Sequence, residues 1–141
     1  MPRFNDGLFA AGKRKGAPYA FVLEALEPLQ SRTRLIFGCV AVYVGEKIVL
    51  LLRDRREGTA DNGMWVATTL EHHASLRREL PSMRSIEVFG KGERETGWQV
   101  LPADAEDFEE AALRACELIL GRDPRIGKVP KAKRPRAAGN R

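Results

Sequence analysis

The stretch RTRLIFGCVAVYVGEKIVLLLRDR, residues 32–55, decides the fold of this chain. Two apolar runs within it, residues 33–44 and 47–53, are rich in β-branched side chains and carry little charge, which is typical of strands with at least one buried face. Gly45-Glu46 lies between the runs, and glycine reaches positive φ at little cost, so we expect a tight antiparallel hairpin there. Gly38 interrupts the first run, and we expect it to mark a bulge or bend within one strand.

Three helices and three further strands are expected around this hairpin. A first helix opens at Pro18 and ends near Pro28, and a second starts at a capping box formed by Thr68 and Glu71 and stops before Pro81. The remaining expected elements are strands at residues 64–67, 85–89 and 97–101 and a charged loop at residues 53–62.

The last helix has the most regular apolar face in the chain. It begins at an Asp104 cap, places Phe108 and Ile119 on one face, and ends at Gly121. The element order is therefore α-β-β-β-α-β-β-α, an α+β fold with helices gathered against one antiparallel sheet. The side chains expected in the core are Phe37, Val42, Ile48, Leu50, Trp65, Trp98, Phe108 and Ile119.

Positive charge is concentrated at the two ends of the chain. Residues 1–18 carry four basic and one acidic side chain, residues 19–121 carry twelve basic and seventeen acidic, and residues 122–141 carry eight basic and one acidic. We therefore expect a flexible basic arm at 1–17, a single domain at 18–121, and a disordered basic tail at 122–141. An acidic body does not resemble a domain that reads a nucleic-acid groove with its folded face.

The basic tail is the only candidate contact with nucleic acid, and we expect such contact to be weak and nonspecific because it rests on charge alone. The alternative is a solvated tail without a partner, because the charge run contains no interleaved aromatic residues. The candidate side chains are Lys128, Lys131, Lys133, Arg134 and Arg136.

We expect a cytoplasmic protein that makes no membrane contact. No apolar stretch approaches the roughly 20 residues needed to cross a bilayer, and the N-terminal sequence lacks the apolar segment of a signal peptide. Cys39 and Cys116 lie in apolar runs, so we expect both to be buried and reduced.

The sequence supplies no complete set of reacting or metal-binding groups. His72 and His73 are adjacent, so on a helix they point about 100° apart and cannot chelate one ion, and we expect both to be exposed. The glycine-rich residues 90–97 lack the Lys-Ser/Thr of a phosphate-binding loop, and no serine has a glycine-flanked elbow. The charged loop could line the rim of a site, although a solvated loop is the default interpretation. We expect no catalytic residue, no metal, no cofactor and no enzyme activity.

Two segments resemble the N-terminal domain of the TfoX/Sxy competence regulators. The run LEALEPLQSRTRLIFGCVAVYVGEKIVLLL at 23–52 is similar to that family's leading helix, Arg-rich approach, Met-Phe-Gly-Gly-like bend and Tyr-Val-(Asp)-Gly turn. The segment GWQVLPADAEDFEEAALRACELIL at 97–120 is similar to its aromatic strand, Val-Pro exit and long final helix. The matching positions in the first run are Arg32, Arg34, Phe37-Gly38, Tyr43-Val44-Gly45 and Ile48 to Leu52.

The resemblance implies a noncatalytic α+β module of the TfoX N-terminal type, here stand-alone and without that family's C-terminal helical domain. We expect it to bind a protein partner or to self-associate as a homo-dimer, in a regulatory role. The alternative is a nucleic-acid-associated regulator whose basic tails supply electrostatic affinity while the body supplies location or dimerisation.

Overall fold

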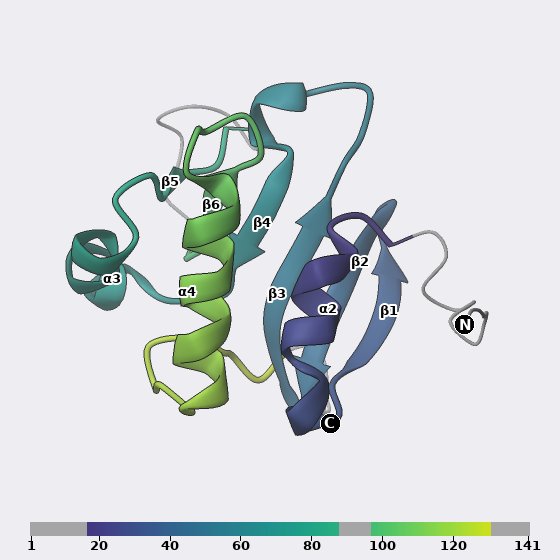
Figure 1. The fold of residues 1–141 in the computed structure, drawn as a ribbon, viewed down its shortest axis with the longest axis vertical. Coiled ribbons are helices and arrows are strands. Elements are labelled where there is room, and N and C mark those ends of the chain that lie inside the picture. The colour runs from purple at the N-terminus through teal and green to yellow at the C-terminus, as the bar shows by residue number, and fades with distance from the viewer. Residues whose placement is uncertain (1–16, 88–96, 131–141) are drawn as a thin grey trace, which may run out of the picture.

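Six strands form one antiparallel sheet in the part of the chain that the computed structural model describes, residues 17–87 and 97–130 (Figure 1). Their spatial order is β1-β2-β3-β4-β6-β5, and every neighbouring pair is antiparallel. This confirms the α+β class with an antiparallel sheet. The strands are β1 (Arg32–Ile36), β2 (Cys39–Val44), β3 (Lys47–Arg53), β4 (Gly63–Val66), β5 (Arg84–Ser85) and β6 (Gln99–Pro102).

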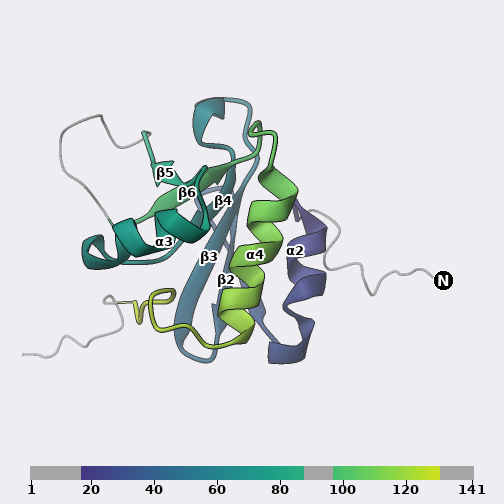
Figure 2. The same ribbon diagram turned by 60° about the vertical axis from the view of Figure 1, so that its left-hand side comes forward.

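The described helices lie on one side of the sheet. Figures 1 and 2 show α2 and α4 next to each other across the same face, with α3 near β5 and β6. The α-helices are α2 (Ala20–Ala25), α3 (His73–Glu79) and α4 (Phe108–Leu120), and the 3-10 turns are η2 (Glu27–Leu29), η3 (Thr59–Asp61) and η4 (Leu70–His72).

The central strands β2, β3 and β4 are buried on both faces, which is why their sequences run apolar without alternation. On the helix-covered face, Val42 and Leu50 pack in one core cluster with Phe108 of α4. On the opposite face, Leu51 and Trp65 belong to a second, smaller cluster. Both faces of the sheet therefore contribute to stability.

A β-bulge interrupts the pairing of β2 with β3. Val42 lies opposite Leu50 and Tyr43 lies opposite Ile48, so Val49 has no counterpart on β2. As a result Val49 and Leu50 both belong to the helix-side core, whereas Ile48 packs against the cluster on the other face.

The sequence predicts that the first apolar run is one bent strand. The structure shows instead a hairpin formed by β1 and β2. Phe37 and Gly38 form its two-residue turn with φ of 51° and 77°. Positive φ at both central residues is the geometry of the type I′ turn, which matches the twist of paired strands. The predicted bulge at Gly38 is therefore wrong, and the observed element order has one strand more than expected. The second hairpin is confirmed, with Gly45 at φ 63° and Val44 opposite Lys47.

The two predicted helix caps are wrong. The Thr68 hydroxyl donates 2.6 Å to the Arg125 carbonyl instead of capping a helix, and η4 starts after Thr69 with no side-chain cap. The last helix begins at Phe108 after Asp107, also with no side-chain cap, so Asp104 lies in the preceding turn. In both places a distant contact or a turn replaces the local bond that the sequence pattern suggested. The expected strand at 85–89 is shortened to β5, and its last two residues lie outside the described residues.

The chain from 122 to 130 packs on the domain, although the sequence assigns it to a disordered tail. Ile126 is buried in the main core, and the backbones of Lys128 and Ile48 bond to each other in both directions at 2.9 and 3.0 Å. Gly127 N–H also donates 2.8 Å to the Ala67 carbonyl. These residues belong to the folded domain because they extend the sheet at the β-bulge.

The expected core is largely confirmed. Phe37 is the error, because it is 87% exposed at the tip of the first hairpin. Ile48 and Trp98 are partly buried. Cys39 and Cys116 are both buried and free, as expected. The expected core residues that are buried are Val42, Leu50, Trp65, Phe108 and Ile119.

Candidate functional site at the free edge of the sheet

The strand β1 forms one edge of the sheet and pairs with β2 alone among the described residues. Four of its five residues are exposed, in contrast to β2, which is buried along almost its whole length. An edge strand presents unpaired backbone N–H and C=O groups, and these can accept a further strand. We define the β1 edge as Arg32–Ile36 together with the Phe37-Gly38 turn.

The two faces of the β1 edge differ in chemistry. Thr33 and Leu35 pair with Val42 and Val40, whose side chains belong to the helix-side core. Leu35 nevertheless stays 78% exposed, because the described helices leave this edge of the sheet uncovered (Figure 1). This face of the edge is therefore apolar and open.

The opposite face of the β1 edge is basic. Arg32 lies over the Tyr43 ring, 5.4 Å from its centroid, and donates 2.7 Å to the Gly45 carbonyl. Arg34 is exposed, and no described residue forms an ion pair with it. Charged residues on an exposed edge limit indiscriminate pairing with other strands.

The Phe37-Gly38 turn is held in place by Arg55, which comes from the loop after β3. Arg55 Nη1 donates 2.7 Å to the Phe37 carbonyl, and its guanidinium fills the space that a Cβ on residue 38 would need. Phe37 adopts a left-handed backbone conformation that bulky side chains rarely take, while its ring stays exposed. The turn thus displays an aromatic ring at a strained position, a combination that favours a functional role.

The loop that positions Arg55 is ordered by side chains rather than solvated. Asn62 Oδ1 accepts from the Arg55 backbone N–H and from Arg53 Nη1, both at 2.9 Å, and Asn62 Nδ2 donates 2.9 Å to the Arg55 carbonyl. Arg53 is buried and also donates 2.7 Å to the Gly58 carbonyl. The default expectation of a solvated loop is therefore wrong at Arg53.

Asp61 is the other buried charge of this loop. It is 1% exposed and accepts 3.2 Å from Arg84 and 2.7 Å from the Glu87 backbone N–H. Its own carbonyl accepts 2.9 Å from Trp65 Nε1. Asp61 therefore joins the loop to β4 and β5 and does not line the rim of a site.

Both cysteines and one histidine of the described residues are buried. Burial raises the pKa of the Cys116 thiol to about 12 and also raises the pKa of Cys39, which disfavours a reactive thiolate at either position. His73 is buried, contrary to expectation, with Nε2 3.2 Å from the Gly97 carbonyl, and His72 pairs with Glu71 at 3.3 Å. The described residues contain no cluster of three side chains that could hold a metal ion.

The structure describes only one of the predicted nucleic-acid residues, so this site stays a prediction. Lys128 lies on the body, where its backbone bridges to β3. Lys131, Lys133, Arg134 and Arg136 lie outside the described residues. Among the described residues, no helix is long and apolar enough to cross a membrane.

Sequence reasoning missed the β1 edge because it treated the first apolar run as one strand. Two signals in the sequence could have found it. Phe37-Gly38 divides that run with a glycine at the second position, as in two-residue hairpins, and Arg32 and Arg34 alternate with uncharged residues, as on exposed edge strands.

Comparison with family models, with curated proteins and with solved structures finds no match to this chain.

Proposed function

We propose that this chain is a noncatalytic binding module of the TfoX N-terminal type, which binds protein by adding a strand along the β1 edge. One observation carries the proposal: β1 has no second strand partner among the described residues, and the β1 edge carries two large exposed apolar side chains, Leu35 and Phe37. Strand addition uses main-chain hydrogen bonds for affinity and alternate side chains for specificity.

A second copy of the chain is the partner that the strand itself can accept. In a symmetric antiparallel pair centred on Leu35, the two Leu35 side chains face each other and Arg34 lies opposite Ile36 of the other copy. Centring the pair on Arg34 would instead bring two guanidinium groups together, which is destabilising. Charge therefore favours the Leu35-centred register over the Arg34-centred one.

The test is sedimentation velocity of the whole chain from about 10 µM to about 1 mM, a range that captures weak and moderate dimers. We expect a concentration-dependent dimer that Leu35→Lys abolishes, because the substitution places an ammonium group at the centre of the pair. Leu70→Lys is the matched control, since Leu70 is also exposed but lies in η4, outside the β1 edge. A dimer that survives Leu35→Lys would place the interface elsewhere.

An unlike partner is tested by capture on the immobilised chain, with cross-links mapped by mass spectrometry. We expect cross-links to Lys47, which follows β2 in the second hairpin, and loss of the captured protein with Leu35→Lys but not with Leu70→Lys. Equal capture by both variants, together with a monomer at every concentration, would reject the β1 edge as the binding surface.

A further inference from the structure

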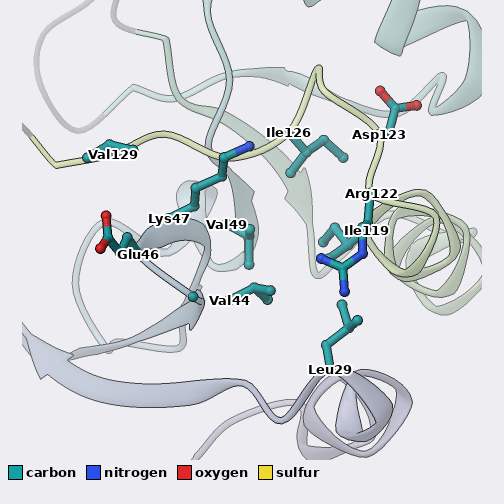
Figure 3. A pocket seen from close by; sticks show the side chains of 11 residues that line it. Leu29, Val44, Glu46, Lys47, Val49, Ile119, Arg122, Asp123, Ile126 and Val129 are labelled. Carbon is teal, nitrogen blue, oxygen red and sulfur yellow. The ribbon is translucent and has the colours of Figure 1, made fainter.

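A groove lies on the surface near the C-terminal end of α2. This open groove of about 520 Å³ is bounded by η2, the turn between β2 and β3, the end of α4 and the segment 122–130 (Figure 3). Its apolar side chains come from η2, from β2 and β3 beside their turn, from α4 and from the segment 122–130, and they are Leu29, Val44, Val49, Ile119, Ile126 and Val129.

The walls of the groove are fixed by long-range bonds. The paired backbones of Ile48 and Lys128 hold the outer wall to β3. Arg125 fixes the same segment to α3, because it donates 2.7 Å to Glu79 Oε2 and 3.1 Å to the Ser75 hydroxyl. Gly127 adopts φ 118° and lies against the Lys47 side chain, where a Cβ would meet Lys47 Cδ at 3.1 Å. The groove is therefore built into the fold.

The charges around the groove are arranged asymmetrically. Figure 3 shows the Arg122 guanidinium directed into the space between Ile119, Val44 and Leu29, whereas the carboxylates of Glu46 and Asp123 point away from it. Asp123 is occupied by Arg125, which bonds it at 2.7 Å and lowers its pKa. Neither Arg122 nor Lys47 has an ion-pair partner among the described residues. The groove thus presents positive charge beside an apolar floor.

The Arg122 side chain is positioned by the backbone turn that ends α4. Arg122 N–H bonds to the Ile119 carbonyl and Asp123 N–H bonds to the Leu118 carbonyl, which is the Schellman ending of α4. Arg122 occupies the left-handed position of that motif with φ 59°, where glycine is preferred, although Gly121 stands one residue earlier. The ending places a guanidinium, rather than a glycine, at the mouth of the groove.

We propose that this groove binds a small apolar carboxylate, an alkyl chain of about eight carbons with one anionic head group. The carboxylate accepts hydrogen bonds from Arg122, and the chain lies on Val44, Val49 and Ile119. Lys47, whose ammonium is directed toward Ile126, adds positive charge to the groove without contacting the carboxylate (Figure 3). Guanidinium and carboxylate match in geometry as well as charge, which favours this head group over a neutral one. The groove contains no residue of the β1 edge, so a failure of one proposal would leave the other unaffected.

The test is a titration of the isotope-labelled whole chain with octanoate, followed by amide and methyl chemical shifts. We expect saturable shifts at Val44, Val49 and Ile126, and binding at least about tenfold weaker for octanol and for acetate, since each lacks one half of the complementary ligand. Octanol binding as tightly as octanoate, or no saturable shift in these residues, would overturn the proposal.

Three variants separate the ligand site from folding. Arg122→Gly removes the cation but suits the left-handed position, so the protein should remain folded while octanoate affinity falls about tenfold. Arg122→Gln should weaken octanoate to a similar extent. Arg78→Gln is the matched control, because Arg78 is exposed on α3 and does not line the groove, and its octanoate affinity should be unchanged. Unchanged affinity in a folded Arg122→Gly chain would reject Arg122 as the anion contact.

Discussion

The two strands that flank β2 have opposite character. β3 is buried along most of its length, contributes to the core on both faces of the sheet, and is bonded at its start to the segment 122–130. β1 has the same partner strand, yet two of its five residues are arginines and four of the five are exposed. Both strands pair with β2, so the difference shows that packing across the faces of the sheet, and not pairing alone, separates a core strand from an exposed edge strand.

The largest expected difference is between truncations on the two strands. Leu50→Ala should lower the free energy of unfolding by about 2–5 kcal/mol, because Leu50 is fully buried in the helix-side core. Leu35→Ala should change it by less than about 0.5 kcal/mol, because Leu35 is 78% exposed. Urea denaturation of both variants measures the contrast, and a loss at Leu35 comparable with that at Leu50 would show that the edge is covered in solution.

Two C-terminal truncations test whether the segment 122–130, which bonds to β3 and not to β1, stabilises the domain. A chain that ends at Pro130 should have a free energy of unfolding within about 0.5 kcal/mol of that of the whole chain. For a chain that ends at Gly121, the free energy of unfolding should fall by about 2–4 kcal/mol, because the truncation removes buried Ile126 and the backbone bonds to Ile48. Equal stability of the two chains would contradict the role given to this segment.

The chain that ends at Pro130 also tests the nucleic-acid alternative. If the basic tail supplies electrostatic affinity, the whole chain should bind DNA weakly, with an affinity that falls steeply as salt rises, and the shortened chain should lose this binding. Fluorescence anisotropy of a labelled duplex measures both. Tight binding by the shortened chain at physiological salt would instead move a nucleic-acid site onto the body.

The two hairpin turns should respond differently to an added methyl group. Gly45→Ala should cost about 1 kcal/mol, since Gly45 has positive φ but open space around its Cα. Gly38→Ala should cost about 1–2 kcal/mol, because it adds a clash with Arg55, whose flexible end must then release the Phe37 carbonyl. Thermal unfolding of the pair ranks them, and a smaller loss at Gly38 would show that Arg55 does not order the turn.

The smallest expected effect is a gain in stability. Phe37→Asn creates an Asn-Gly turn suited to positive φ at both positions, so it should stabilise the hairpin by up to about 1 kcal/mol, measured by thermal unfolding. The same variant should weaken any complex formed along the β1 edge, because the exposed ring is lost. A loss of stability in the Phe37→Asn variant would mean that the ring contributes to folding rather than to binding.

The sequence was sufficient to predict the parts of the fold set by local pattern. The β2–β3 hairpin, the regular apolar face of α4 and the burial of Leu50 and Trp65 all follow from periodicity and from glycine at a turn. Phe37 was misplaced because an aromatic residue between two apolar runs has the composition of a core residue, and composition does not reveal that a chain reverses there.

The remaining errors involve contacts between residues far apart in sequence. Thr68 bonds to Arg125, 57 residues away, and Lys128 pairs with Ile48 at the β-bulge, so neither the lost helix cap nor the ordered C-terminal segment has a local signature. The groove depends on the same contacts, because its outer wall is this segment. Of the groove residues, only Arg122 had a local signal in the sequence, because it directly follows Gly121, where the last helix is predicted to end.

The two margins of the sheet also differ in length, and this limits how far assembly can proceed. β1 offers five residues to an incoming strand, whereas β5 at the other margin offers two among the described residues. In a pair joined symmetrically through β1, the five-residue edge of each copy is paired, and only the two-residue β5 edges remain at the margins of the combined sheet. In the dimer that we propose, growth would therefore stop at a closed pair instead of continuing into a filament, because the arginine-bearing strand of each copy is already paired.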